Sequence, residues 1–350
     1  MSAVPVTRAS RSRARLALQR FALGAAGLAA TILMLLAATF ALSSLSPVDP
    51  ALRVVGDHAS AGAYEQARRD LGLDRPLPVR FLRYVQQLAK GDLGMSTATG
   101  QPVRDDLRAA IPATWELATC ALITSAALGF AAGVAAAARA GTWVDGAVRV
   151  VSLLGSAVPA FWLGLLLLYL FYARLQWAGG PGRLDDAFEY TIERRTGLVL
   201  VDAWLSGVPG ALRSACAHLV LPVAVLSANA VGTIARMSRT ALLEELGKEY
   251  VTLARAKGAG EGRVLWGHVL PNVLGLLVVV LGLSYASLLE GAVLTETVFA
   301  WPGVGRYLTT AIFAGDAAAI LGATLVIGLS FSLLNGLSDR LARAADPRAR

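Results

Sequence analysis

Six long apolar runs constrain the fold of this 350-residue chain more than any other feature of its sequence. Each run reaches the length of about 20 residues that a helix needs to cross the hydrocarbon core of a bilayer. Hydrophobic residues make up 55% of the chain and charged residues only 16%, whereas soluble domains carry about 25% charged residues. The sequence therefore predicts an all-α membrane protein with six transmembrane helices.

The first apolar run follows basic residues, as a signal peptide would, but it exceeds the roughly 7–15 residues of a signal core, so we interpret it as a membrane anchor. The chain is expected to begin with an N-terminal tail (1–20), a first span (21–45) and an extracytoplasmic region (46–112), and to end with a C-terminal tail (338–350). Between them lies a membrane core (113–342). Within this core we expect spans at 117–138, 148–173 and 215–235, a loop at 236–272, a fifth span at 273–294, a re-entrant outer segment at 295–316 and a sixth span at 317–337.

The charges of the loops predict the orientation of the chain. Residues 1–20 contain five arginines and no acidic residue, and the loops on that side of the six spans carry a net charge of +10, whereas the opposite side sums to zero. Basic excess is retained on the cytoplasmic side, so both termini and the loop 236–272 are expected there. The isoelectric point near 9.9 could suggest nucleic-acid binding, but charge dispersed over four loops is better explained by membrane topology, and we expect no nucleic acid.

Residues 249–271, EYVTLARAKGAGEGRVLWGHVLP, form a charged segment between two apolar runs. Apolar spacing predicts a first helix that Gly258 ends, because glycine accepts the left-handed conformation that closes a helix. A turn at 258–260 would lead to a second helix that opens with Glu261 and ends where Pro271 prevents continuation. We call residues 249–271 the elbow and predict a docking element; an ordinary amphipathic loop helix is the alternative.

The elbow resembles the signature loop of binding-protein-dependent ABC importer permeases. In that family a glycine is followed by nine residues and a four-residue stretch that ends in Leu-Pro, as Gly258 is followed here by 259–267 and 268–271. The general pattern has Glu-Ala-Ala where this chain has residues 252–254, Thr-Leu-Ala. Residues 250–258 are instead similar to the branch that transports dipeptides, oligopeptides and nickel.

Two further elements resemble the same branch. Residues 71–96 contain its Leu-Gly-Leu-Asp-x-Pro and Gly-Asp-Leu-Gly-x-Ser patterns, and residues 296–305 match Glu-Thr-Val-Phe-x-Trp-Pro-Gly-x-Gly. The Trp-Pro-Gly sequence forces a turn before a short apolar helix. Of the family's Arg-Asp-Tyr-Pro element only Asp316 is present, as a candidate helix N-cap. The region 46–112 would face a binding protein or cover the entrance of the pathway.

The resemblance implies a permease subunit of an ATP-driven importer for peptides or related small solutes, forming half of a translocation pathway. The sequence has no Gly-x4-Gly-Lys-Ser/Thr loop to cradle ATP phosphates, so we expect no enzymatic activity and no bound cofactor, with ATP used by partner subunits. Implied partners are a second homologous permease, two ABC ATPase subunits, an extracytoplasmic substrate-binding protein and membrane lipid. The location is the cytoplasmic (inner) membrane of a bacterium or archaeon, crossed several times.

Two groups of residues are candidates for function, and no catalytic or metal-binding residue is expected. Cys120 and Cys216 lie in apolar runs and suggest neither a disulfide nor a metal site. The resemblance implies that the coupling loop would contact the ATPases through Tyr250, Leu253, Ala254, Arg255, Ala256, Lys257, Gly258, Arg263, Leu270 and Pro271. The gate and outer segment would involve Pro159, expected to kink the third span, together with Glu290, Glu296, Trp301, Pro302 and Gly303.

Two other functions remain as alternatives. An ATP-independent secondary transporter or channel would be expected to carry paired charges inside the membrane, yet the spans contain almost none apart from Arg149 and Glu290 near their ends. A membrane-embedded enzyme would need a catalytic pattern such as His-Glu-x-x-His, which the sequence lacks. Uptake without ATP would favour the first alternative, and activity of the isolated chain on a peptide would favour the second.

Overall fold

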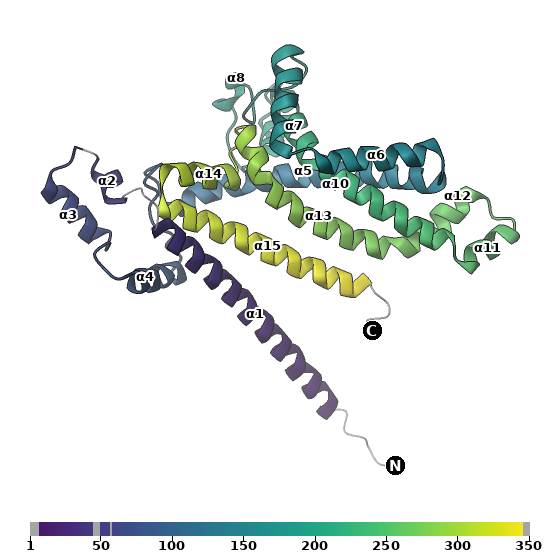
Figure 1. Cartoon of the computed structure of the whole chain (residues 1–350), viewed down its shortest axis with the longest axis horizontal. Helices are drawn as coiled ribbons and strands as arrows, with labels where there is room; N and C mark the ends of the chain where they lie inside the picture. Colours follow the sequence, from purple (N-terminus) through teal and green to yellow (C-terminus); the bar gives the residue numbers. More distant parts are fainter. Residues whose placement is uncertain (1–6, 45–49, 57, 346–350) are drawn as a thin grey trace. The chain divides into compact units, whose positions relative to one another are not determined.

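The structure, a computed structural model, describes residues 7–44, 50–56 and 58–345 (Figure 1). The chain divides into two compact units, one made of residues 1–103 and 314–332 and the other of residues 104–313 and 333–350. Apart from an isolated bridge between Met95 and Pro102, the regular elements of the described residues are helices. The predicted all-α class is confirmed.

The first unit begins with the long helix α1. It contains α1 (Thr7–Ser44), α2 (Pro50–Val55), α3 (Ala61–Asp70), α4 (Leu77–Ala89) and the first half of α15 (Ala317–Ala345). Helix α1 starts inside the predicted tail, and the part of it that is long and apolar enough to cross a membrane includes Ala26–Ser44. Residue 45, the predicted end of the first span, lies outside the described residues.

The region between α1 and residue 103 is fixed by aromatic packing and by one carboxylate. Phe40 of α1 packs against Phe81 and Tyr84 of α4, with ring centroids 5.5 and 6.3 Å apart. Asp316 caps α15, accepting a hydrogen bond from the backbone N–H of Ala319 at 3.0 Å, and it also accepts one from the Ser96 hydroxyl at 2.7 Å. The predicted N-cap at Asp316 is confirmed, and it also anchors the loop before α5.

The second unit is built around two long helices, α10 and α13. Its elements are α5 (Val103–Ala138), α6 (Trp143–Ala157), α7 (Ala160–Leu167), the π-helix η1 (Leu168–Arg174), α8 (Asp186–Glu189), α9 (Val199–Ser206), α10 (Ala211–Leu246), α11 (Glu249–Ala256), α12 (Glu261–Arg263), the π-helix η2 (Val264–Val269), α13 (Leu270–Val298), α14 (Val304–Ala314) and the end of α15.

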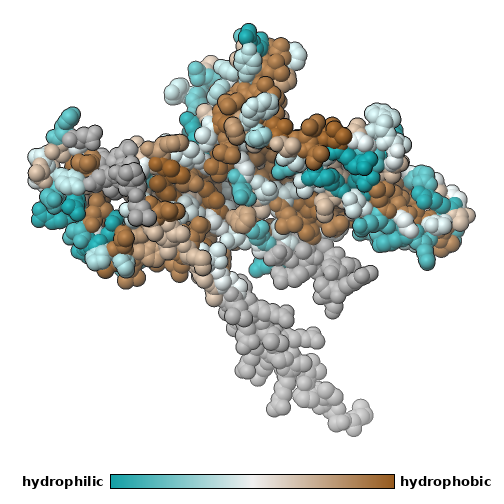
Figure 2. Space-filling model, in the orientation of Figure 1, coloured by the Kyte–Doolittle hydropathy of each residue, from teal (hydrophilic) through white to brown (hydrophobic). Residues whose placement is uncertain are grey.

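Helix α10 packs along α13 on one side and α6 on another. Small residues permit the close approach that stabilises helix pairs in lipid. A Cβ on Gly232 of α10 would overlap the backbone oxygen of Ser152 of α6, so these two backbones touch. Figure 2 shows apolar surface over much of the exposed face of the helices, while polar residues gather over α11 and α12.

Five helices of the described residues are long and apolar enough to cross a membrane, and the number rises to six if one bent pair counts as a span. The bent pair is α6 with α7 and η1, in place of the predicted third span, and it turns through 99°. Pro159 stands at the start of α7 and the preceding Val158 is extended, with ψ of 126°, as expected for a residue before proline. The predicted kink at Pro159 is confirmed and amounts to a break.

One prediction about the elbow is wrong. Pro271 does not end the second short helix, because η2 passes directly into α13 and Pro271 lies in the first turn of α13. Proline is tolerated there because an N–H in the first helical turn needs no partner. The side-chain amide of Asn272 donates a hydrogen bond to the carbonyl of His268 at 3.0 Å, which adds a contact at the junction between η2 and α13.

Candidate functional site

The bend of the elbow is a glycine-closed helix end. Helix α11 is closed by two backbone bonds, from Gly258 N–H to the Arg255 carbonyl at 2.9 Å and from Ala259 N–H to the Ala254 carbonyl at 3.1 Å. This is the Schellman arrangement, which needs a left-handed residue, and Gly258 supplies it with φ of +86°. An added Cβ at Gly258 would meet no atom within 4 Å, so backbone conformation alone demands the glycine.

A charged pair spans the bend. The Arg255 guanidinium donates two hydrogen bonds to the Glu261 carboxylate, at 2.8 and 3.0 Å, and joins the end of α11 to the start of α12. Both side chains are exposed, so solvent screens the pair and its contribution to stability is small. The hydrogen bond to Glu261 raises the pKa of Arg255. The pair therefore orients the bend more than it stabilises it.

The base of the elbow is held by a polar cluster that we call the Tyr250 clamp, made of Glu245, Lys248, Tyr250 and Asn272. The Tyr250 hydroxyl donates to Glu245 of α10 at 2.8 Å and accepts from the Asn272 amide of α13 at 3.1 Å. Lys248 also donates to Glu245. Burial raises the pKa of Tyr250, and the Glu245 carboxylate adds to the rise. One phenol thus ties the elbow to both long helices.

Apolar side chains support the elbow from below. Val251 of α11 and Val264 and Val269 of η2 are fully buried, in one cluster with Leu242 of α10 and Val273 of α13. Each fully buried side chain of this kind contributes about 1.5–3 kcal/mol relative to an exposed one. The elbow is therefore a packed extension of the two long helices, with a fixed shape at its tip.

The tip of the elbow carries a hollow of about 360 Å³. It is lined by Tyr250, Leu253, Ala254, Lys257, Gly258, Ala259, Arg263 and His268. Six of the ten predicted coupling residues thus meet at one surface feature. Arg255 is instead paired with Glu261, Ala256 is exposed outside the hollow, and Leu270 and Pro271 belong to the start of α13.

A second carboxylate braces α10 where it approaches the elbow. Asp145 of α6 is 1% exposed and receives two hydrogen bonds from Arg239 of α10, at 2.6 and 2.8 Å. The backbone N–H of Gly141 donates to the same carboxylate at 3.1 Å. Two-point Arg–carboxylate contacts fix geometry as well as adding energy. This pair leaves no signal in the sequence, because its partners are separated by 94 residues.

At the opposite end of α13 the chain makes the Trp-Pro-Gly turn, residues 296–306. Glu296 is fully buried and accepts hydrogen bonds from the Thr114 hydroxyl at 2.6 Å and from the Arg306 backbone N–H at 3.1 Å. The Trp301 ring is also fully buried and donates to the Ala113 carbonyl at 2.9 Å. The carboxylate of Glu296 thus caps the first turn of α14, where unpaired N–H groups attract negative charge.

Two glycines of this turn are required by crowding. A Cβ on Gly303 would overlap the Glu296 carboxylate, and one on Gly305 would overlap the backbone of Val293. The spacing of glycines after the Trp-Pro pair therefore follows from how closely α14 approaches the end of α13. Of the residues assigned to the gate and outer segment, Glu296, Trp301, Pro302 and Gly303 belong to this turn, while Pro159 and Glu290 lie elsewhere in the unit.

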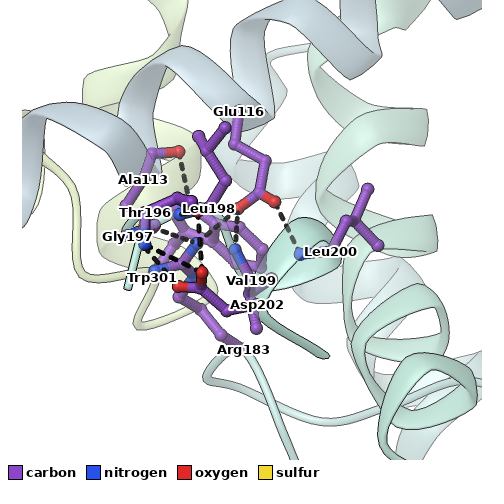
Figure 3. A network of polar contacts seen from close by, with 10 residues as sticks. All are labelled: Ala113, Glu116, Arg183, Thr196, Gly197, Leu198, Val199, Leu200, Asp202 and Trp301. Carbon is purple, nitrogen blue, oxygen red and sulfur yellow. Dashed lines mark hydrogen bonds and ion pairs between the residues drawn. The ribbon is translucent and has the colours of Figure 1, made fainter. Parts of the chain in front are cut away.

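Behind Trp301 lies a buried ionic network that sequence reasoning missed (Figure 3). Arg183 stacks over the Trp301 ring, 5.2 Å from its centroid, and pairs with Glu116 of α5. Glu116 also accepts from the N–H groups of Val199 and Leu200, at 3.0 and 2.8 Å. A buried pair of this kind requires such additional bonds to offset its desolvation. It fixes the loop before α9 against α5.

Asp202 closes the same loop. Its carboxylate accepts three hydrogen bonds, from the backbone N–H and hydroxyl of Thr196 at 2.9 and 2.8 Å and from the Gly197 N–H at 3.0 Å. Burial favours the neutral acid, but these bonds outweigh it and hold the pKa of Asp202 below its usual value. No signal in the sequence pairs Asp202 with these residues beyond their proximity along the chain.

The chain is similar to known membrane proteins. A family model described as "Binding-protein-dependent transport system inner membrane component" matches residues 129–350, and a second, described as "Binding-prot-dependent transport system membrane comp, N-term", matches residues 17–118. A solved structure of the MetNI methionine ABC transporter in inward-facing conformations covers 67% of this chain and 94% of its own, at 20% identity and a TM-score of 0.47.

Curated relatives are similar over most of their length. The probable D,D-dipeptide transport system permease protein DdpB of Escherichia coli (strain K12) is 44% identical over 89% of this chain and 91% of its own. The di/tripeptide transport system permease protein DppB of Pseudomonas aeruginosa (strain UCBPP-PA14) is 41% identical over 89% of this chain and 93% of its own. The chain therefore belongs to the family of binding-protein-dependent transport system inner membrane components.

Proposed function

We propose that this chain is the permease subunit of an ATP-driven importer for peptides or related small solutes, and that it forms half of the translocation pathway. The observation that carries the proposal is 44% identity, over nine tenths of the chain, to a permease named for dipeptide transport. The membrane-length helices of the second unit supply the spans that a pathway requires. A binding protein, a second homologous permease and two ATPases complete the assembly.

The elbow is the part through which ATP hydrolysis acts. Its hollow combines small residues, which admit a partner's backbone, with Lys257 and Arg263 at the rim. The Tyr250 clamp and the buried valines hold the tip rigidly on α10 and α13, so a movement imposed on the tip is passed to both helices. The excess of basic residues in the loops of this side supports a cytoplasmic elbow and cytoplasmic termini.

The broken third span is the hinge of the gate. The 99° bend at Pro159 interrupts the hydrogen bonds of the helix, and a break of this kind concentrates rotation at a few residues when one helix group rocks against another. The region from 50 to 102, with α2, α3 and α4, faces the extracytoplasmic side and is available to a binding protein.

The test is ATP-dependent peptide uptake by the complete importer in proteoliposomes. Replacement of Gly258 by Trp is expected to abolish uptake while membrane insertion is unchanged. The rate of ATP hydrolysis in this variant should no longer respond to the substrate-loaded binding protein. Full uptake by this variant would refute the docking role of the elbow. Uptake by the chain without ATP and without partner subunits would support a secondary transporter or channel instead.

A further inference from the structure

A hollow of about 560 Å³ in the second unit is lined by residues of α7, α10 and α13. Its walls are one face of each long helix, since lining residues recur every three or four positions, at 226, 229, 230, 233 and 237 on α10 and at 280, 284, 287, 291 and 294 on α13. The volume falls in the range of sites that hold small molecules, about 300–1,000 Å³. It is large enough for a short peptide.

Most of the lining is apolar, and its polar members include one charged residue. Asn229 and Thr233 line the α10 side, while Ser287 and Glu290 line the α13 side. No lysine, arginine or histidine lines this hollow. Its ionisable lining residue is therefore a carboxylate, accompanied by an amide and hydroxyls that can donate as well as accept hydrogen bonds.

Glu290 is an unusual residue for its position. It stands between Leu288, Leu289 and Gly291 in the apolar helix α13, about two turns before the helix ends at Val298. Its side chain is exposed to the hollow, and within the part of the chain that the structure describes it has neither a hydrogen-bond donor nor a basic partner. A charge within a membrane helix is unfavourable, so it is expected to serve a pathway or a ligand.

Glu296, six residues later on the same helix, is a carboxylate with a structural role and serves as a comparison for Glu290. It is fully buried and bonded to Thr114 and Arg306. Glu290 has none of these features, because it faces open space beside Asn229 and Ser287. A carboxylate without a partner, in a hollow without basic groups, attracts a cation that brings its own hydrogen-bond donors.

We propose that Glu290 binds the α-ammonium group of peptides as they cross the membrane, while Asn229 and Ser287 hydrogen-bond to the peptide backbone. The inference rests on the proposed function and adds a residue that determines substrate preference inside the permease. An ammonium group presents three donors to a carboxylate, and charge-assisted hydrogen bonds are about twice as strong as neutral ones. Solutes whose amino terminus is blocked would lose this contact but would keep their other contacts along the pathway.

The experiment uses the complete importer, reconstituted in proteoliposomes with its second permease, ATPases and binding protein. Uptake of labelled alanyl-alanine is compared with uptake of its N-acetyl derivative, which lacks the ammonium group. The variants are Glu290→Gln, which removes the charge, and Glu290→Asp, which keeps it. Glu193→Gln is the matched control, because Glu193 is exposed and its ion pair within the described residues is with Arg195, two residues away.

The preference for alanyl-alanine in the wild type includes the selectivity of the binding protein, so only its change on substitution reports on Glu290. Loss of one charge-assisted bond is expected to lower alanyl-alanine uptake by Glu290→Gln about tenfold. Uptake of the acetylated peptide should be unchanged, and Glu290→Asp should retain most of the preference. Glu193→Gln should behave as the wild type, and all complexes should purify intact with ATPase activity that responds to the loaded binding protein.

Three results would overturn the inference. One is an equal fall in the uptake of both peptides by Glu290→Gln, which would show that Glu290 does not recognise the ammonium group. Another is unchanged uptake of both. A third is failure of the Glu290→Gln complex to assemble, which would assign Glu290 to a contact between subunits. Absence of ATP-dependent uptake in the wild type would be a different failure, because it would refute the proposed function and the inference with it.

Discussion

Helix α13 carries the elbow at one end and the Trp-Pro-Gly turn at the other, and the two ends use glycine for opposite reasons. At the elbow, Gly258 has a left-handed backbone and open space around it. At the turn, Gly303 and Gly305 are needed because side chains and backbone press against them. The elbow glycine therefore leaves the surface around it open, whereas the glycines of the turn allow close packing inside the protein.

The charges differ in the same way. The side chains of the Arg255–Glu261 pair of the elbow are exposed and, among the described residues, bond only to each other. Glu296 at the turn is buried among donors, and Glu116 with Arg183 lies behind Trp301. The contacts of the turn are therefore of the kind that stabilise a fold, whereas the elbow leaves its groups exposed for contact. Substitutions at the two ends should therefore separate stability from coupling.

The largest loss of stability is expected at the turn. Gly305→Ala forces a methyl group against the Val293 backbone, and overpacking of this kind destabilises by about 1–3 kcal/mol. The melting temperature of the purified complex should fall, and uptake should fall with it. Gly146→Ala is the control, since an added Cβ there meets no atom within 4 Å. Equal stability of the two variants would contradict the crowding argument.

The next effect is expected at the bend of the elbow. Gly258→Ala places a side chain in a left-handed conformation, which is unfavourable by about 1–2 kcal/mol. Because the Cβ meets nothing, the strain is confined to the bend, so coupling between ATP hydrolysis and uptake should weaken and the melting temperature should fall less than in Gly305→Ala. Gly260→Ala is a suitable comparison, with an ordinary φ of −67° and open space. A fall in melting temperature for Gly258→Ala as large as that for Gly305→Ala would contradict the difference between the elbow and the Trp-Pro-Gly turn.

The Tyr250 clamp should give a smaller change. Tyr250→Phe keeps the ring but removes the hydroxyl that joins Glu245 to Asn272, and the net loss for one such bond is about 0.5–1.5 kcal/mol. Hydrogen exchange in α11 and η2 should rise, while α14 stays protected. Uptake should fall more than ATPase activity, because the tip would move without moving α10 and α13. Unchanged exchange across the elbow would show that the clamp has no mechanical role.

The smallest effect is expected for the exposed pair across the bend. Arg255→Ala removes a screened surface contact, so the melting temperature should not change measurably. Lys257→Ala, a change of charge at the rim of the hollow, is the informative companion and should weaken ATPase docking at low ionic strength more than at high, because salt screens the charge that the substitution removes. A clear loss of stability in Arg255→Ala would place the pair among the structural contacts and weaken the comparison.

Features that depend on neighbouring residues could be predicted from the sequence. Gly258 ends α11, Glu261 begins α12, and Pro159 breaks the third span, because backbone conformation and capping are local properties. The one local error, at Pro271, arose because a π-helix can lead into an α-helix whose first turn accepts proline.

Features that depend on packing between distant segments could not be predicted. Glu116 and Arg183 are 67 residues apart, and Asp145 and Arg239 are 94 apart, so neither pair leaves a periodic or motif signal. Glu290 was visible as a lone charge in an apolar run, but its place beside Asn229 follows only from how α10 lies against α13. The role of Glu296 likewise required the position of α14.

Crosslinking from the elbow is the most direct measurement of its coupling role. Leu253 is 55% exposed and lines the hollow, so Leu253→Cys, with Cys120 and Cys216 replaced by alanine, presents one thiol at the tip in intact membranes. The account predicts that this thiol crosslinks to an ATP-hydrolysing subunit and resists membrane-impermeant reagents added to intact cells. Labelling from outside the cell, or crosslinks that never reach an ATPase, would contradict it.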